Sequence, residues 1–112
     1  MTIFLISIGG ALGAISRYII GYGGLFSSLI SIVIINAIAS FSIGYLFKFQ
    51  GASIWFFFGI GFCGAFSTFS TFSLDSARLL MAGSIQQFII YFLVMNGLSI
   101  GACLIGYKLA LP

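Results

Sequence analysis

The residues best suited to chemistry lie in one segment, residues 59–73, which reads GIGFCGAFSTFSTFS. Phe66, Phe69 and Phe72 alternate there with serine and threonine, and three glycines precede them. A polar group left without a partner in lipid costs roughly several kcal/mol, so this segment must face protein or water. Its hydroxyls can then donate hydrogen bonds to a passing anion, or they can join neighbouring helices.

The spacing of these phenylalanines does not suit a regular helix. An α-helix has about 3.6 residues per turn, so rings three residues apart drift by about 60° per step around it. We therefore expect a break in the backbone after Gly64. Non-helical backbone is tolerated at membrane depth only where it is enclosed or lines a cavity. There its carbonyls can bind a cation, while helix N-termini favour an anion.

Few polar side chains interrupt the chain elsewhere. The amide of Asn36 offers two donors and an acceptor, so it can bridge helices or present N–H groups to an anion. Arg17 lies close enough to the end of its apolar run to reach the membrane interface, or it makes a water-filled vestibule positive and attracts anions. Tyr91 and Ser99, eight residues apart, fall near one helix face, where they suit either packing or a pore wall.

The elements that position these residues must be membrane helices, because the composition excludes a soluble domain. Of 112 residues, 62% are hydrophobic and 4% are charged, whereas soluble domains are about one quarter charged. A crossing needs about 20 apolar residues. Four runs supply them, at residues 3–22, 29–47, 54–74 and 85–107. The sequence predicts an all-α membrane protein in which residues 1–112 form one four-span domain, with residues 75–84 as the longest joint.

The ionisable residues exclude several functions. The chain has no histidine and a single acid, Asp75, so a proton-coupled pump or a small multidrug exporter lacks the carboxylate that it needs within the membrane. Four scattered cations make no basic patch for nucleic acid. Three glycines have G-x-G-x-x-G spacing, but dinucleotide binding also requires a preceding strand and a following acid. The joints are too short for a water-soluble active site, and we expect no enzyme.

The cations also bear on topology. Four crossings put Arg17 and Arg78 toward one face of the membrane and Lys48 and Lys108 toward the other. Lysine and arginine normally gather on the cytoplasmic side, but here each face has two of them, so the charges give no preferred orientation. We therefore expect dual topology, with inverted copies paired about a two-fold axis in the membrane plane. The alternative is that a partner protein determines the orientation of the chain in the membrane.

The first run carries a packing signal. Gly9 with Gly13, and Gly10 with Ala14, form pairs of small residues four apart on adjacent lines of a helix. Such pairs let two helix backbones approach closely. We interpret these glycines as packing residues.

Three motifs together resemble one known family, the Fluc or CrcB fluoride channels. GGALGAISRY at residues 9–18 looks like the family's first-helix motif, Asn36 like its second-helix asparagine, and GFCGAFSTFSTFS at residues 61–73 like its broken third helix. The resemblance covers almost the whole chain. It implies an antiparallel dual-topology dimer with two pores, which exports fluoride from the cytoplasm across the bacterial cell membrane by passive electrodiffusion.

The same resemblance implies roles for individual residues. Asn36 would donate to fluoride, and the other residues of the fluoride pore would be Phe69, Phe72, Ser70, Thr71, Tyr91 and Ser99. The backbone carbonyls of Gly64 and Ser67, from both subunits, would hold a structural Na⁺ at the dimer two-fold axis. The ring edges of the two phenylalanines are electropositive and can face an anion in a narrow passage.

Some positions depart from the family pattern. Ser31 and Ile32 stand where Gly-Thr is usual, Met95 replaces a serine of the fourth helix, and Asp75 stands where Glu is common. Because the family includes paired paralogues with one degraded pore, the chain as one subunit of an obligate heterodimer stays an alternative to the homodimer. A non-conducting accessory membrane protein, in which the hydroxyls only join helices, is a further alternative.

Overall fold

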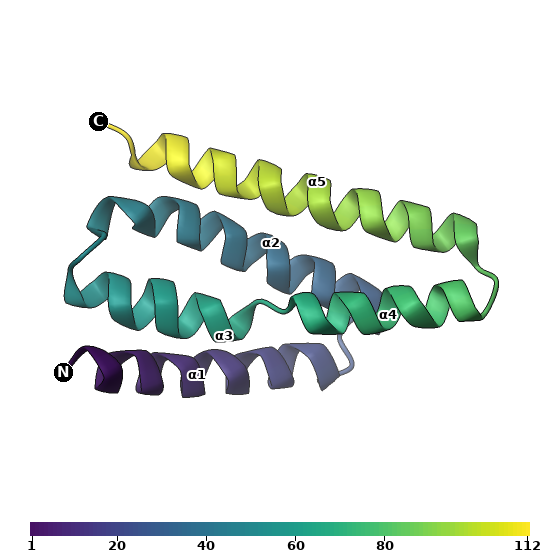
Figure 1. Cartoon of the computed structure of the whole chain (residues 1–112), viewed down its shortest axis with the longest axis horizontal. Coiled ribbons are helices and arrows are strands. Elements are labelled where there is room, and N and C mark those ends of the chain that lie inside the picture. The colour runs from purple at the N-terminus through teal and green to yellow at the C-terminus, as the bar shows by residue number, and fades with distance from the viewer.

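The computed structural model describes all 112 residues, and it contains helices and no strands. Its elements in chain order are α1 (Thr2–Tyr22), α2 (Ser28–Leu46), the 3₁₀ turn η1 (Phe47–Phe49), the π-helix η2 (Trp55–Cys63), α3 (Gly64–Phe66), α4 (Phe69–Met81) and α5 (Ile85–Ala110). They form four spans long and apolar enough to cross a membrane. The spans lie side by side, with both chain ends at the same end of the bundle (Figure 1). The predicted four-span, all-α fold is confirmed.

The first and third spans pack closely because α1 presents glycines where the two backbones come nearest. Gly9 and Gly13 are the buried residues of α1. A Cβ added at Gly9 would collide with the carbonyl oxygen of Phe57, and one at Gly13 with that of Phe62. The prediction that these glycines serve packing is confirmed.

The second and fourth spans form the other close pair. Gly44 of α2 lies against the backbone of Cys103, and Gly106 of α5 lies against that of Phe41. The core lies between these helices and the two halves of the third span. Its buried members are Ile32, Ile35, Ala39, Phe66, Phe72, Tyr91 and Met95.

The third span differs from the prediction at its C-terminal end. The expected run ended at Leu74, but α4 continues to Met81, so the joint predicted at residues 75–84 shrinks to residues 82–84. The charge of Asp75 does not end the helix because its side chain is buried and accepts a hydrogen bond from the Tyr91 hydroxyl at 3.2 Å.

The break lies later than the sequence suggested. We expected it after Gly64, but α3 remains helical through Phe66, and the non-helical residues are Ser67 and Thr68. The segment before it, η2, is a π-helix of nine residues, which the sequence did not predict. The prediction of a broken third helix is therefore confirmed, and the break begins two residues later than expected, because Gly64 is compatible with helix and does not interrupt it.

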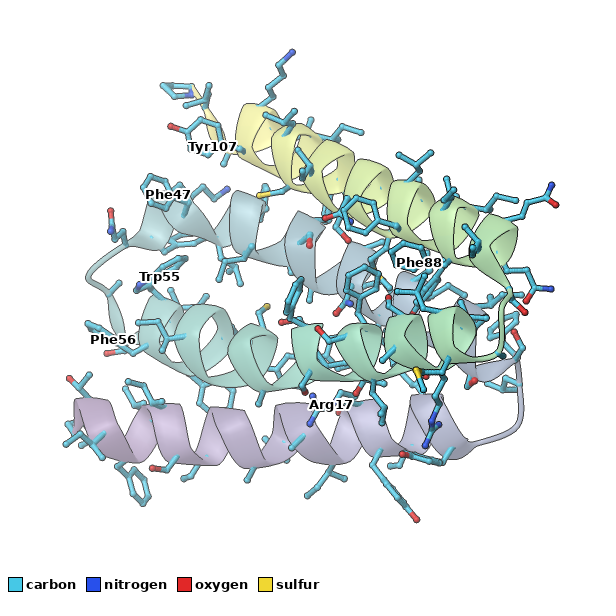
Figure 2. All side chains as sticks on the ribbon, turned by 45° about the vertical axis from the view of Figure 1, so that its right-hand side comes forward. Arg17, Phe47, Trp55, Phe56, Phe88 and Tyr107 are labelled. Carbon is cyan, nitrogen blue, oxygen red and sulfur yellow. The ribbon has the colours of Figure 1, made fainter.

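The two ends of the bundle carry charged and aromatic residues. At the end that holds the chain termini, Phe47 contacts Trp55 and Tyr107, with ring centroids 6.0 and 5.6 Å apart (Figure 2). Lys48 lies 3.8 Å from the centroid of the Tyr45 ring at the same end. Such residues are typical of the membrane–water interface.

Candidate functional site

The break in the third span is a short extended linker between two helices. Ser67 has φ −72° and ψ 158°, and Thr68 has φ −151° and ψ 113°. Thr68 is also the N-cap of α4, because its Oγ1 accepts a hydrogen bond from the Thr71 N–H at 3.1 Å. The positive end of the α4 dipole therefore begins at the break, inside the protein.

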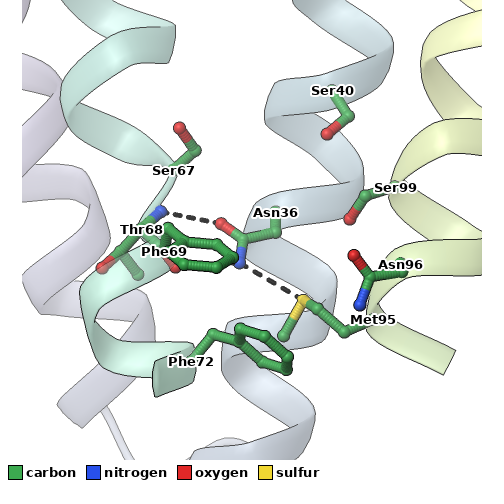
Figure 3. Close-up of a pocket in the computed structure, with 9 residues that line it drawn as sticks. All are labelled: Asn36, Ser40, Ser67, Thr68, Phe69, Phe72, Met95, Asn96 and Ser99. Carbon is green, nitrogen blue, oxygen red and sulfur yellow. Dashed lines mark hydrogen bonds between the residues drawn. The ribbon is translucent and has the colours of Figure 1, made fainter. Parts of the chain in front are cut away.

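Asn36 of α2 lies opposite this linker and holds it. Its Oδ1 accepts from the Thr68 N–H at 2.7 Å (Figure 3). Its Nδ2 donates to the Thr68 carbonyl at 3.1 Å. The same Nδ2 donates to the sulfur of Met95 at 3.3 Å. Asn36 and Thr68 are 9% and 5% exposed, so these bonds form away from solvent. One side chain thus replaces helix hydrogen bonds that the break removes.

A cavity of about 190 Å³ lies beside this contact. The residues that line it are Asn36, Ser40, Ser67, Thr68, Phe69, Phe72, Met95, Asn96 and Ser99 (Figure 3). The Oγ of Ser99 is buried and has no hydrogen-bond partner. The cavity therefore contains an unused donor, and it brings together four of the residues predicted for the pore: Asn36, Phe69, Phe72 and Ser99.

The two phenylalanines of the cavity differ in burial. Phe72 is 4% exposed and its ring lies 5.2 Å from that of Tyr91, whereas Phe69 is 75% exposed. Their ring centroids are 5.5 Å apart. Phe72 is thus fixed within the bundle, and Phe69 projects from its surface at the level of the break.

Three other predicted pore residues lie outside this cavity. The Ser70 and Thr71 hydroxyls lie 3.2 and 3.0 Å from Thr68 Oγ1 and form a local network at the start of α4. Tyr91 donates its hydroxyl to Asp75, and it lines a separate apolar groove between α2 and α5. The structure therefore places the hydroxyl-bearing residues on more than one side of the break.

A second, larger cavity of about 490 Å³ adjoins the break and is positively charged. Its charged lining residues are Arg17, Arg78 and Asp75, and Thr71 also faces it. The guanidinium of Arg17 donates to the Ser67 carbonyl at 3.3 Å, so it points into the bundle at the break (Figure 2). Of the two interpretations left open for Arg17, this geometry favours the vestibule.

The two carbonyls predicted for a cation differ in their partners. In a continuous helix the Thr68 N–H would reach the Gly64 carbonyl, but here it donates to Asn36 instead. The Ser67 carbonyl accepts from Arg17. Gly64 is exposed, and both residues line a cavity of about 140 Å³ on the α2 side of the third span. The break thus removes the usual helix donor of the Gly64 carbonyl.

Sequence reasoning missed several residues of this site. Thr68 was passed over as one member of a hydroxyl repeat, although an N-cap threonine at a helix start is a recognisable signal. Ser40 follows Asn36 by one helical turn, and Asn96 precedes Ser99 by three residues, so helical spacing could have found both. Met95 was identified only as a departure from the family pattern; its thioether is a weak acceptor, but the sequence does not indicate that Asn36 is its donor.

Fold and site together define a class: a four-span membrane protein whose third span is broken around a cavity lined by amides, hydroxyls and phenyl rings. The profile of the family described as CrcB-like protein, Camphor Resistance (CrcB), matches residues 4–107. The chain belongs to this family, as its three motifs suggested.

Individual relatives of the chain carry more specific names than the family does. The chain is 44% identical over 90 residues to the fluoride-specific ion channel FluC of Pyrococcus abyssi, covering 73% of each protein. It is 33% identical over 121 residues to FluC 1 of Halalkalibacterium halodurans, covering 96% of this chain and 95% of the relative. It is 31% identical over 115 residues to FluC 2 of Rhodococcus jostii, covering 97% and 98%. Both carry the same fluoride-specific description.

Proposed function

We propose that this protein is a fluoride-selective channel that lets fluoride leave the cytoplasm by passive electrodiffusion. The observation that carries the proposal is the cavity at the break, where Asn36, Ser99, Phe69 and Phe72 meet within a membrane span. Relatives that are 44% and 33% identical to this chain bear the name of fluoride-specific channels. No acid lies in this cavity, which agrees with conduction and not with proton-coupled transport.

The chemistry of the cavity suits a small, strongly hydrated anion. A selective path must replace the water around the ion with donors without trapping it. The N–H and O–H groups of Asn36 and Ser99 supply donors, and the rings of Phe69 and Phe72 present electropositive edges. The α4 N-terminus at Thr68 adds a positive dipole end. Arg17 and Arg78 raise the local anion concentration in the adjoining vestibule.

The pore is completed by a second copy in the inverted orientation. Phe69 is 75% exposed, and Gly64, whose carbonyl has lost its usual helix donor, is also exposed, so polar and aromatic groups of the break stand uncovered on the bundle surface. Lipid does not satisfy a carbonyl. The cations support an inverted partner, because Arg17 and Arg78 lie toward one end of the bundle and Lys48 and Lys108 toward the other.

A structural Na⁺ between the two copies fits the carbonyls that the break provides. Two oxygens per copy, from Gly64 and Ser67, would give four hard ligands, and Gly64 has lost its helix partner. When bound, the ion supplies positive charge that neutralises these carbonyl dipoles. The Ser67 carbonyl already accepts from the Arg17 guanidinium, so Na⁺ would share this oxygen with a cationic donor, whereas Gly64 has no such donor. Exchanging Na⁺ for N-methylglucamine during purification should shift the protein from dimer to monomer in gel filtration.

Flux from liposomes tests the proposed function. Vesicles containing the purified protein and loaded with potassium fluoride should release fluoride to a fluoride-selective electrode when valinomycin supplies the counter-current. Vesicles loaded with potassium chloride should retain chloride. Equal release of both ions would contradict fluoride selectivity.

A second candidate function is that of one subunit in an obligate heterodimer. Met95 favours it, because an apolar side chain occupies the cavity wall where the family pattern has serine, and it covers the Asn36 amide. Relatives with numbered names, FluC 1 and FluC 2, are consistent with paralogous sets. If the chain alone conducts nothing but conducts when co-expressed with a paralogue from the same genome, the heterodimer replaces the homodimer.

A further inference from the structure

The Asn36 amide has two N–H bonds, and they serve different purposes. One pairs with the Thr68 carbonyl at 3.1 Å while Oδ1 accepts from the Thr68 N–H at 2.7 Å, so these two bonds together hold the break. Losing either would leave a buried backbone group without a partner, which is costly. This N–H is therefore not available to an ion.

The second N–H of Asn36 faces Met95. Its partner is the thioether sulfur at 3.3 Å, and a thioether is a weak acceptor. Met95 is 4% exposed and lines the same cavity as Asn36 and Ser99 (Figure 3). The sulfur therefore occupies the place that an anion on this N–H would take.

The surroundings of Met95 allow its side chain to move away from the Asn36 N–H, so that an anion can take its position. A methionine side chain has three rotatable bonds and adapts to irregular space, and the cavity beside it holds about 190 Å³. Ser99 follows Met95 by one turn of α5, and its buried hydroxyl has no partner. An anion that displaced the sulfur would gain the Asn36 N–H and the Ser99 O–H as two charge-assisted donors.

We propose that Met95 is a displaceable cover on the Asn36 amide, which satisfies this N–H when the cavity is empty, competes with the anion for it, and so sets the affinity of the site for fluoride. The inference rests on the proposed fluoride channel and adds a specificity-determining residue to it. The Met95 sulfur is a weak, neutral acceptor, so it gives the Asn36 N–H a partner when the cavity is empty. An anion can displace the sulfur, and the competing sulfur keeps the anion from binding too tightly to leave.

Side-chain amide spectra can test this directly, because the chain has two asparagines, Asn36 and Asn96. Protein labelled with ¹⁵N-asparagine in micelles is titrated with sodium fluoride at constant ionic strength, with sodium chloride making up the balance. One Asn36 proton should move downfield with fluoride while the proton bonded to Thr68 stays in place. The Asn36 proton bonded to the Thr68 carbonyl is the internal reference, because Asn96 lines the same cavity and its signals can also respond to an anion there.

Two variants of similar size then separate covering from packing. Met95→Leu cannot accept a hydrogen bond, so the fluoride midpoint should fall by about three- to tenfold, the range that one modest hydrogen bond supplies. Met95→Gln offers a stronger acceptor, so the midpoint should rise by a similar factor. Met81→Leu, at a position 89% exposed, should leave it unchanged.

The outcomes distinguish this inference from the proposed function. If fluoride shifts the Asn36 proton in the native protein but the Leu and Gln variants move the midpoint in the same direction, or leave it unchanged, the cover is disproved and the channel stands. If fluoride shifts no Asn36 proton in any variant and no flux is seen, both fail. Should Met95→Leu not fold, the Gln variant alone decides, and a midpoint equal to or below the native value overturns the proposal.

Discussion

At the residue scale, the central contact is the pairing of the Asn36 amide with the Thr68 peptide groups. Both partners are buried, and the bonds measure 2.7 and 3.1 Å. Because the chain is extended at Thr68, its N–H does not reach the Gly64 carbonyl as it would in a helix, and Asn36 Oδ1 accepts from it instead. The site and the fold therefore depend on the same side chain.

Asn36→Ala should destabilise the protein. It leaves the Thr68 N–H and carbonyl without partners, and each unsatisfied buried group costs about 1–3 kcal/mol. The melting temperature in detergent should fall by several degrees. Asn96→Ala is the matched control, because its amide bonds only the carbonyl of Phe92 on its own helix. Equal melting of the two variants would contradict a holding role for Asn36.

Replacing the two cavity phenylalanines singly by isoleucine should separate conduction from assembly. Phe69 is 75% exposed, so Phe69→Ile should leave the fold of each subunit intact while fluoride flux falls at least tenfold, because the electropositive ring edge is lost. Phe72 is 4% exposed, so Phe72→Ile should lower both flux and melting temperature.

Flux measured with gel filtration of the same samples checks this. If Phe69→Ile abolishes the dimer as well as the flux, the ring joins subunits and the accessory-protein alternative gains. If both variants conduct as the native protein does, neither ring lines the pore.

At the element scale, the third span is positioned from both sides. The glycine face of α1 lets the η2 backbone come into contact, and α2 presents Asn36 to the break from the other side. Because α1 also carries Arg17, the same packing delivers a guanidinium to the Ser67 carbonyl. The position of Arg17 at the larger cavity therefore depends on the approach of α1 to η2.

Gly9→Ala should weaken this approach strongly. Its Cβ would meet the carbonyl oxygen of Phe57, which is backbone and cannot rotate away, so the two spans must separate. Overpacking of this kind costs about 1–3 kcal/mol. Gly97→Ala is the control, since nothing lies near its added Cβ and alanine favours helix. Thermal melting compares them, and a Gly9→Ala protein as stable as Gly97→Ala would show that the contact is loose.

At the scale of the whole molecule, the four cations divide evenly between the two halves of the bundle. The even number of spans returns both chain ends to one side, so Lys48 and Lys108 share that end, and Arg17 and Arg78 lie toward the other. With no excess of positive charge at either end, the orientation rule gives no preference.

An engineered cysteine should therefore be labelled from both sides of the membrane. With Cys63 and Cys103 replaced by alanine, Ala52→Cys in the exposed joint between α2 and η2 should react with an impermeant maleimide in about half of the molecules of intact cells. Adding Gln50→Lys and Ser53→Lys should bias this joint to the cytoplasm and lower the labelled fraction. Labelling of all or none of the unbiased protein would reject dual topology.

The four spans could be predicted from the sequence because each depends on a local property. The length of an apolar run decides whether a segment crosses the bilayer. The small residues Gly9 and Gly13 indicate that another helix packs closely against α1, but they do not indicate which helix. Asn36 and Ser99 were predictable as candidate site residues, since polar groups within apolar runs need a reason to be there. That signal too is carried by single positions. Phe69 and Phe72 were predicted from the resemblance of their repeat to a family motif.

The position of the break and the grouping around it came only from the tertiary structure. Gly64 was compatible with helix or break, and the choice of Ser67 and Thr68 depends on Asn36, 32 residues earlier, which replaces the lost backbone bonds. Likewise Asp75 could end a helix in water, but Tyr91 of another span satisfies it and α4 continues. The sequence alone determined which residues need partners. Which partners they find is a matter of distances between spans, and these arise only when the helices pack.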